Sequence, residues 1–140
     1  MYDKEITPQD IEKILKLYAK STELAGADQL DGRLQEFTYE LLQTLFETGF
    51  LMVFNWHEWL NRNEVFKDLN KDIHEEIKSE DLETLRKLMT SYVRGDRFNE
   101  GLLERIVADG KLQCILQRLR EIKELECYDK NAVEKPPHMK

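Results

Sequence analysis

The chain has 140 residues, of which 41% are hydrophobic, 9% aromatic and 35% charged, and its formal net charge is −7. A domain of this length can bury a core without disulfides or a structural metal, and the aromatic content argues against a disordered chain. The longest apolar run, residues 50–54, is far shorter than the ~20 residues that cross a bilayer, so no membrane partner is expected.

The acidic N-terminus lacks the basic and then apolar order of a secretory signal. Cys114 and Cys127 are the only cysteines, and they form no CxxC motif. Two such cysteines favour reduced thiols over a disulfide framework. We therefore expect a cytoplasmic protein.

The charge is unevenly distributed. Residues 1–83 hold 9 Lys and Arg against 19 Asp and Glu, whereas residues 84–123 hold 9 against 5. This pattern indicates either an anion-binding face or two halves that neutralise each other when packed. The overall acidity argues against nonspecific nucleic-acid binding, which depends on neutralising phosphates.

Helical spacing of apolar residues dominates the N-terminal half. Thr7 and Pro8 predict a helix start, and the stripe that follows ends near Gly26. A second helix is expected over residues 37–48, with Gly49 as its stop. Residues 50–54 are expected to form a buried extended connection, because no second strand is available to pair with them.

Four further helical segments are predicted. Asn55 and Glu58 have capping-box spacing, and another segment covers residues 65–77. Ser79 predicts the start of the best-marked helix, which ends at Gly95. A shorter helix capped by Asp96 or Asn99 ends at Gly110.

The last helix is expected from Lys111 to about Glu126, followed by a flexible tail over residues 129–140. The sequence therefore predicts one all-α domain over residues 1–128. We expect a compact single-domain bundle of five to seven helices.

Four blocks of the sequence carry a resemblance. They read FNWHEW at 54–59, DLETLRKLM at 81–89, VRGDRFNEG at 93–101 and GKLQCILQRLREI at 110–122. They resemble a bacterial and phage family catalogued as a domain of unknown function, in which an aspartate is usual where Asn55 stands. The resemblance covers roughly residues 36–123 and implies no activity, because the family has none assigned.

The densest polar cluster lies at the predicted turn before the short helix and consists of Arg94, Asp96, Arg97 and Glu100. Two arginines beside a helix start can bind phosphate or carboxylate. The interpretation we favour is structural, with these side chains fixing the corner through hydrogen bonds to free backbone groups. Arg97 and Glu100 are also spaced to form an ion pair.

A second candidate site is formed by Trp56, His57 and Trp59. Two indole rings and an imidazole could stack on a planar ligand. The favoured alternative is that both tryptophans are core anchors and His57 is solvated.

Catalytic, cofactor and metal sites have little support. The three histidines form no HExxH motif, and Asp72 with residues 74–76 is interpreted as a solvated acidic face. A hydrolase using His57, Asp96 and Glu100 would require these groups to converge in one pocket. We predict no catalytic residue, no cofactor and no metal.

The leading prediction is a non-enzymatic cytosolic interaction or regulatory module. Its expected partner is a protein, including a second copy of this chain that binds through one helical face. The alternative is a nucleic-acid or phosphate-ligand site built from Arg94, Arg97 and the last helix. The residues of that helix predicted to be exposed are Lys111, Gln117, Arg118, Arg120 and Glu121.

Overall fold

The computed structural model describes residues 5–28, 31–68 and 71–134, the stretch 126–134 through its backbone alone. All regular structure in these ranges is helical, so the predicted all-α class is confirmed. Seven helices span six residues or more, and an eighth segment, α5, is a single turn. The elements are α1 (Pro8–Leu15), α2 (Tyr18–Glu23), α3 (Gly32–Thr48), α4 (Trp56–Arg62), α5 (His74–Ile77), α6 (Leu82–Gly95), α7 (Leu102–Ala108) and α8 (Lys111–Glu134).

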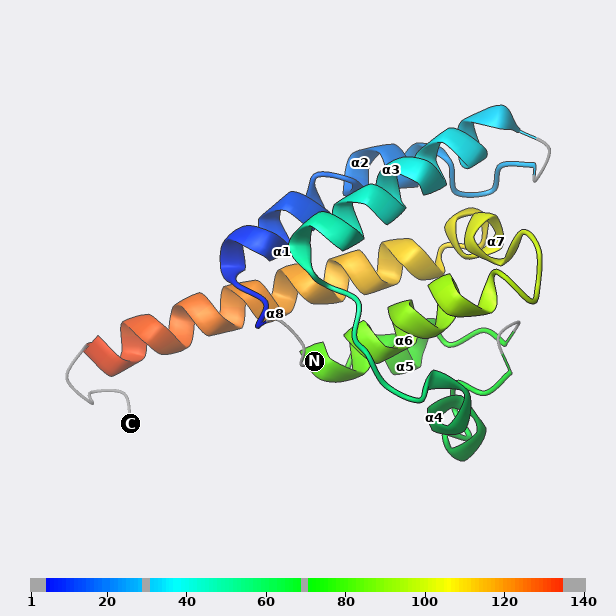
Figure 1. The fold of residues 1–140 in the computed structure, drawn as a ribbon. Coiled ribbons are helices and arrows are strands. Elements are labelled where there is room, and N and C mark those ends of the chain that lie inside the picture. The colour runs from blue at the N-terminus through cyan, green and yellow to red at the C-terminus, as the bar shows by residue number, and fades with distance from the viewer. Residues whose placement is uncertain (1–4, 29–30, 69–70, 135–140) are drawn as a thin grey trace.

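The long helix α8 is the centre of the bundle (Figure 1). Helices α1, α2, α5, α6 and α7 all contact it, α3 lies against α1 and α7, and α4 lies against α6. Fully buried aliphatic side chains from these helices form one core, including Ile11, Leu41, Leu88 and Leu116. No described helix combines the length and apolar character that a bilayer span requires.

Two predicted helix starts are confirmed in atomic detail. The Thr7 hydroxyl accepts from the Asp10 amide and the Asp10 carboxylate accepts from the Thr7 amide, both at 3.1 Å. Asn55 Oδ1 accepts from the Glu58 amide at 3.1 Å. These contacts satisfy amides that a first helical turn leaves free.

Residues 50–54 form an extended connection that is anchored to α6, as the lack of a partner strand predicts. Buried Arg86 donates to the carbonyl oxygens of Phe50 at 2.8 Å and Gly49 at 3.0 Å. The Met52 amide donates to Thr90 Oγ1 at 3.0 Å. Side chains of α6 therefore provide the hydrogen bonds that a second strand would have supplied.

Two helix starts differ from prediction because aspartates act as caps. Helix α3 begins at Gly32, earlier than predicted, and Asp31 accepts from the Arg33 amide at 2.9 Å. Helix α6 begins at Leu82 rather than at Ser79, and Asp81 accepts from the Thr84 amide at 2.9 Å. Aspartate caps a helix at least as well as serine, so Asp81 and not Ser79 occupies the N-cap position of α6.

The single helix predicted over residues 65–77 is wrong. Only α5 is helical there, and residues 69–70 lie outside the described part of the chain. Phe66, Ile73 and Ile77 are nevertheless buried. The apolar spacing therefore identified buried positions correctly, although these positions do not belong to one continuous helix.

The end of α8 also differs from prediction, because the helix continues past Glu126 to Glu134. No glycine or proline stands in this stretch to stop a helix. The last helical turns extend beyond the rest of the bundle (Figure 1). Of the predicted flexible tail, residues 135–140 lie outside the described residues.

Candidate interaction site

The bend between α6 and α7, residues 96–101, is fixed by three polar side chains. Asp96 Oδ1 accepts from the Leu103 amide at 3.1 Å, in the first turn of α7. Asn99 Oδ1 accepts from Arg105 Nη2 at 2.9 Å. Gly101 has a φ of 84°, a left-handed conformation that glycine adopts without a steric penalty. The predicted capping role of Asp96 is therefore present in the structure.

Arg94 and Arg97 have no such role. Both are exposed, and neither guanidinium makes a hydrogen bond or ion pair within the described part of the chain. Glu100 is exposed as well, and among the ion pairs of the described residues there is none between Arg97 and Glu100. The interpretation of this cluster as a locked corner holds for Asp96 but is wrong for the two arginines.

The two arginines instead line one hollow with aromatic side chains. This hollow has a volume of about 320 Å³ and is lined by Arg94, Arg97, Trp56, Phe98 and residues 52–54. The rings of Trp56 and Phe98 stack with centroids 6.3 Å apart and an interplanar angle of 28°. Phe98 is nevertheless 81% exposed. We call Val53, Trp56, Arg94, Arg97 and Phe98 the arginine–aromatic surface.

The aromatic residues of α4 differ in role. Trp59 stacks on buried Phe66 with centroids 5.9 Å apart and acts as a packing anchor. Trp56 is only partly buried and contributes to the surface hollow. His57 is exposed and contacts the Trp56 ring edge-on. Both tryptophans are partly buried and packed against the core, as the core-anchor interpretation predicts, and Trp56 lines the surface hollow as well.

The predicted basic face of α8 is largely consumed by internal contacts. Lys111 is only 2% exposed and pairs with Asp109 at 2.7 Å, so its predicted exposure is wrong. Arg118 donates to the Glu80 carbonyl at 2.7 Å and pairs with Glu121 at 3.1 Å. Arg120 lies over the Tyr18 ring, 5.1 Å from its centroid. These contacts withdraw Lys111 and Arg118 from the predicted basic face, whereas Arg120 remains exposed.

Comparison with protein families matches residues 8–125 to one described as a family of unknown function, DUF6508. The chain belongs to this family. The match begins well before residue 36, where the sequence resemblance started. Packing explains this difference, since α1 and α2 contact α3 and α8 and so belong to the same core. Neither a curated protein nor a solved structure matches the chain.

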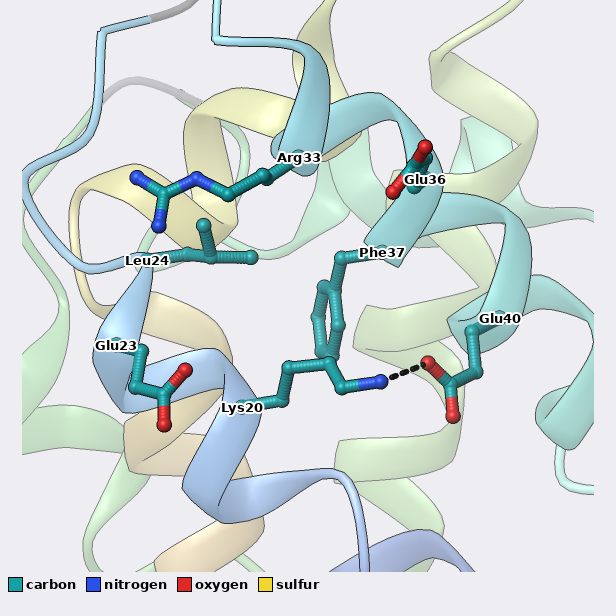
Figure 2. Close-up of a pocket in the computed structure, with 7 residues that line it drawn as sticks. All are labelled: Lys20, Glu23, Leu24, Arg33, Glu36, Phe37 and Glu40. Carbon is teal, nitrogen blue, oxygen red and sulfur yellow. Dashed lines mark hydrogen bonds and ion pairs between the residues drawn. The ribbon is translucent and has the colours of Figure 1, made fainter.

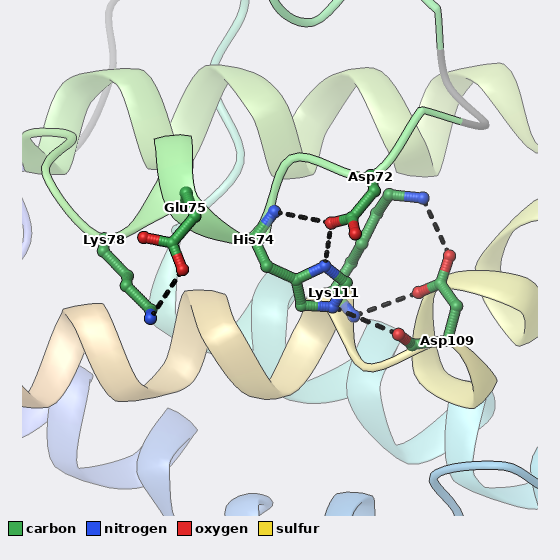
Figure 3. Close-up of polar contacts among 6 residues, drawn as sticks. All are labelled: Asp72, His74, Glu75, Lys78, Asp109 and Lys111. Carbon is green, nitrogen blue, oxygen red and sulfur yellow. Dashed lines mark hydrogen bonds and ion pairs between the residues drawn. The ribbon is translucent and has the colours of Figure 1, made fainter.

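A second polar cluster of this DUF6508 chain surrounds His74 (Figure 3). His74 Nδ1 bonds the Asp72 carboxylate, and Nε2 lies 3.1 Å from the Asp109 carbonyl oxygen. The His74 hydrogen bond lowers the pKa of the Asp72 carboxyl below its ordinary value. His74 therefore links α5 to the turn between α7 and α8, while Asp72 and Glu75 are solvated as predicted.

Metal and hydrolase chemistry gain no support from the geometry. Within the described ranges, no three His, Cys, Asp or Glu side chains gather in a metal-binding arrangement. Asp96 lines a different hollow from Arg94 and Trp56, and its carboxylate is occupied by the Leu103 amide. His57 and Glu100 line neither of these two hollows.

A further hollow of about 300 Å³ lies between α2 and α3 (Figure 2). Buried Leu24 and Phe37 form part of its lining, and Lys20 pairs with Glu40 across it at 3.0 Å. Its rim carries charges of both signs, including Arg33, which is engaged by Asp31 at 2.7 Å. Mixed, paired charges give this hollow no clear ligand preference.

The sequence pointed to the arginines but missed Phe98 and Val53. Phe98 interrupts a run of polar residues at a turn and belongs to no helical stripe. The available signal for an exposed surface was Phe98 itself, a single aromatic residue in a polar turn. Neither neighbouring helix needs this side chain for its apolar face.

Proposed function

We propose that this DUF6508 chain is a non-enzymatic, cytoplasmic interaction module that binds a partner protein through the arginine–aromatic surface. The observation that carries the proposal is the combination of an exposed phenyl ring stacked on Trp56 with two guanidinium groups that have no partner among the described residues. Arginine and aromatic residues are the types enriched where proteins bind one another. The free thiol of Cys114 is compatible with the reducing cytoplasm.

The chemistry of the surface defines the partner segment. Two guanidinium groups favour carboxylates, which they can bind with paired hydrogen bonds. The hollow between Trp56, Phe98 and Met52 favours an apolar side chain. The expected ligand is therefore an acidic segment with a large apolar residue beside its carboxylates.

Binding of single-stranded nucleic acid uses similar groups, since bases stack on aromatic rings and arginines bind phosphates. It is the weaker proposal for this chain. Lys111 and Arg118 of α8, which would extend such a site, are engaged internally, and the net charge is −7.

The test is selection from a random peptide library displayed on phage, followed by titration of the selected peptides. We expect a consensus with Asp or Glu next to Phe, Leu or Trp. Binding should perturb the fluorescence of Trp56, measured in a Trp59→Phe background. Arg94→Ala/Arg97→Ala should weaken binding at least about tenfold, because truncated hot-spot arginines cost more than ~1 kcal/mol.

Arg33→Ala is the matched control, since this exposed arginine lies on α3, outside the surface. Peptides that bind wild type and the double variant equally would refute the proposed surface. Oligothymidylate binding that requires Arg94 and Arg97, with no acidic peptide selected, would favour the nucleic-acid alternative.

A further inference from the structure

A second apolar surface lies on the outer face of α3. Tyr39 and Phe46 are 75% and 66% exposed, and Leu42 between them is partly buried. With Gln35, these residues have the 4-3-4 spacing of a seam along which helices pack. We call Gln35, Tyr39, Leu42 and Phe46 the α3 surface.

Acidic residues border the α3 surface. Gln35, Tyr39 and Leu42 share a hollow of about 250 Å³ with Asp96 and Glu104. Glu36 is exposed, stands one helical turn before Tyr39 on the opposite flank of the seam, and also lines the hollow between α2 and α3 (Figure 2). Glu36 and Glu104 make no side-chain hydrogen bond or ion pair in the part of the chain that the structure describes.

The two surfaces are complementary in charge and alike in apolar content. Within the described residues, the arginine–aromatic surface offers two guanidinium groups without a partner, and the α3 surface is bordered by the unpaired carboxylates of Glu36 and Glu104. Four of the large hydrophobic side chains exposed in the described residues, Tyr39, Phe46, Val53 and Phe98, belong to these two surfaces.

The two surfaces are also neighbours. Asp96 lines the α3 hollow, and the next residue, Arg97, lines the arginine–aromatic hollow, so the α6–α7 bend separates them. Helix α3 continues directly into the extended connection that passes toward α4 (Figure 1). A single contact face can therefore include both surfaces.

We propose that the partner of the arginine–aromatic surface is the α3 surface of a second copy of this chain. This inference rests on the proposed function and names its partner. In a two-fold dimer the arginine–aromatic surface of each protomer contacts the α3 surface of the other, so the same contact forms twice. Arg94 and Arg97 of each protomer then meet Glu36 and Glu104 of the other. Packing α3 against its own copy would instead bring the carboxylates of both copies together, which is unfavourable.

Charge reversal tests this arrangement. Arg94→Glu/Arg97→Glu makes both surfaces acidic, and Glu36→Lys/Glu104→Lys makes both basic. Sedimentation equilibrium should show a dimer of the 16.7 kDa wild-type chain and a rise of at least about tenfold in the dissociation constant for each variant alone. An equimolar mixture should form a heterodimer, because both contacts are then between opposite charges.

Lys13→Glu/Lys16→Glu, on α1 and at its C-cap, is the matched control, since it changes the net charge as much as the arginine reversal and should leave the dimer intact. Circular dichroism confirms that every variant is folded. Three results would overturn the dimer: a wild type that is monomeric at every concentration, variants that dimerise as the wild type does, or a mixture that stays monomeric.

The two proposals fail separately. A monomeric wild type that binds acidic peptides through Arg94 and Arg97 would end the dimer inference and leave the proposed function in place. A dimer insensitive to the arginine reversal, with no peptide selected, would end both.

Discussion

Two arginines of α6, Arg86 and Arg94, and Arg97 just after this helix have different environments. Arg86 is 8% exposed and donates to two carbonyl oxygens of the connection between α3 and α4. Arg94 and Arg97, eight and eleven residues further along the chain, are exposed and have no ion-pair or hydrogen-bond partner among the described residues. The first serves the fold, and the other two are available to a partner.

Truncating Arg86 should therefore destabilise the protein. In Arg86→Ala the Phe50 and Gly49 carbonyls lose their donor, and a buried unsatisfied polar group costs roughly 1–3 kcal/mol. Urea unfolding should show a loss of about that size or more. Lys87→Ala is the control, because its pair with Glu83 is near the surface and should contribute less than about 1 kcal/mol. Equal losses in the two variants would contradict the role of Arg86.

Phe98 should contribute little to stability despite its size. Phe98→Ala removes a ring that is 81% exposed, so the free energy of unfolding should change by about 0.5 kcal/mol or less. Phe66→Ala, which removes a buried ring, should cost about 3–5 kcal/mol. A large loss in Phe98→Ala, measured by the same urea titration, would place this ring in the core.

At the residue scale the sequence predicted part of the site. The charge density around Arg94 and Arg97 identified the bend, but nothing in their spacing distinguished paired from free guanidinium groups. Arg86 was missed because it lies inside the apolar stripe of α6, and its partners are backbone carbonyls 36 and 37 residues away.

The helices themselves follow from local rules where caps are strong. Thr7 and Asn55 begin helices and Gly49 ends one, as predicted. Each of them forms its capping hydrogen bonds with groups no more than four residues away. The segment 65–77 failed, since its apolar residues are buried by long-range packing and not by helical periodicity. Local chemistry therefore predicted the helix ends whose cap was recognised and missed those capped by Asp31 and Asp81.

Aspartate caps should make the protein acid-sensitive. The side-chain hydrogen bond from Arg33 lowers the pKa of Asp31 from 3.8 to about 2, and that from Thr84 lowers the pKa of Asp81. A carboxyl whose pKa is lowered in the folded state binds protons more tightly in the unfolded state. Its contribution to the stability of the fold is therefore present above pH ~4 and is lost toward pH ~2. The melting temperature should fall across that window.

The variant Asp81→Asn should show a shallower fall, since asparagine still caps the helix but does not titrate there. Thermal melts followed by circular dichroism between pH 7 and pH 2 make this comparison. A wild-type melting temperature that stays constant down to pH 2 would contradict the assigned role of these carboxylates.

The turn between α7 and α8 requires a glycine for two reasons. Gly110 has a φ of +89°, and a Cβ there would stand 3.2 Å from His74 Nε2. Gly110→Ala should destabilise the protein by about 1–2 kcal/mol for the left-handed backbone, plus the cost of displacing His74. Gly26→Ala is the control, because its φ is +84° and its surroundings are open. If both variants lose the same stability, the His74 contact is unimportant.

At the scale of the whole molecule, α8 organises the bundle, and the large exposed hydrophobic side chains of the described residues, apart from Leu125 on α8, lie on two neighbouring surfaces. The α3 surface and the arginine–aromatic surface adjoin the α6–α7 bend, where opposite charges and exposed rings are close in the fold. This distribution separates a part of the molecule that stabilises the fold from a part that we propose for association.

The most direct measurement is urea unfolding of Arg94→Ala/Arg97→Ala, at a protein concentration where the wild type is monomeric. Because neither guanidinium has a partner in the described structure, each truncation should change the free energy of unfolding by about 0.5 kcal/mol or less. A loss of about 2 kcal/mol or more in the double variant would show that the arginines support the fold and would contradict their assignment to a partner.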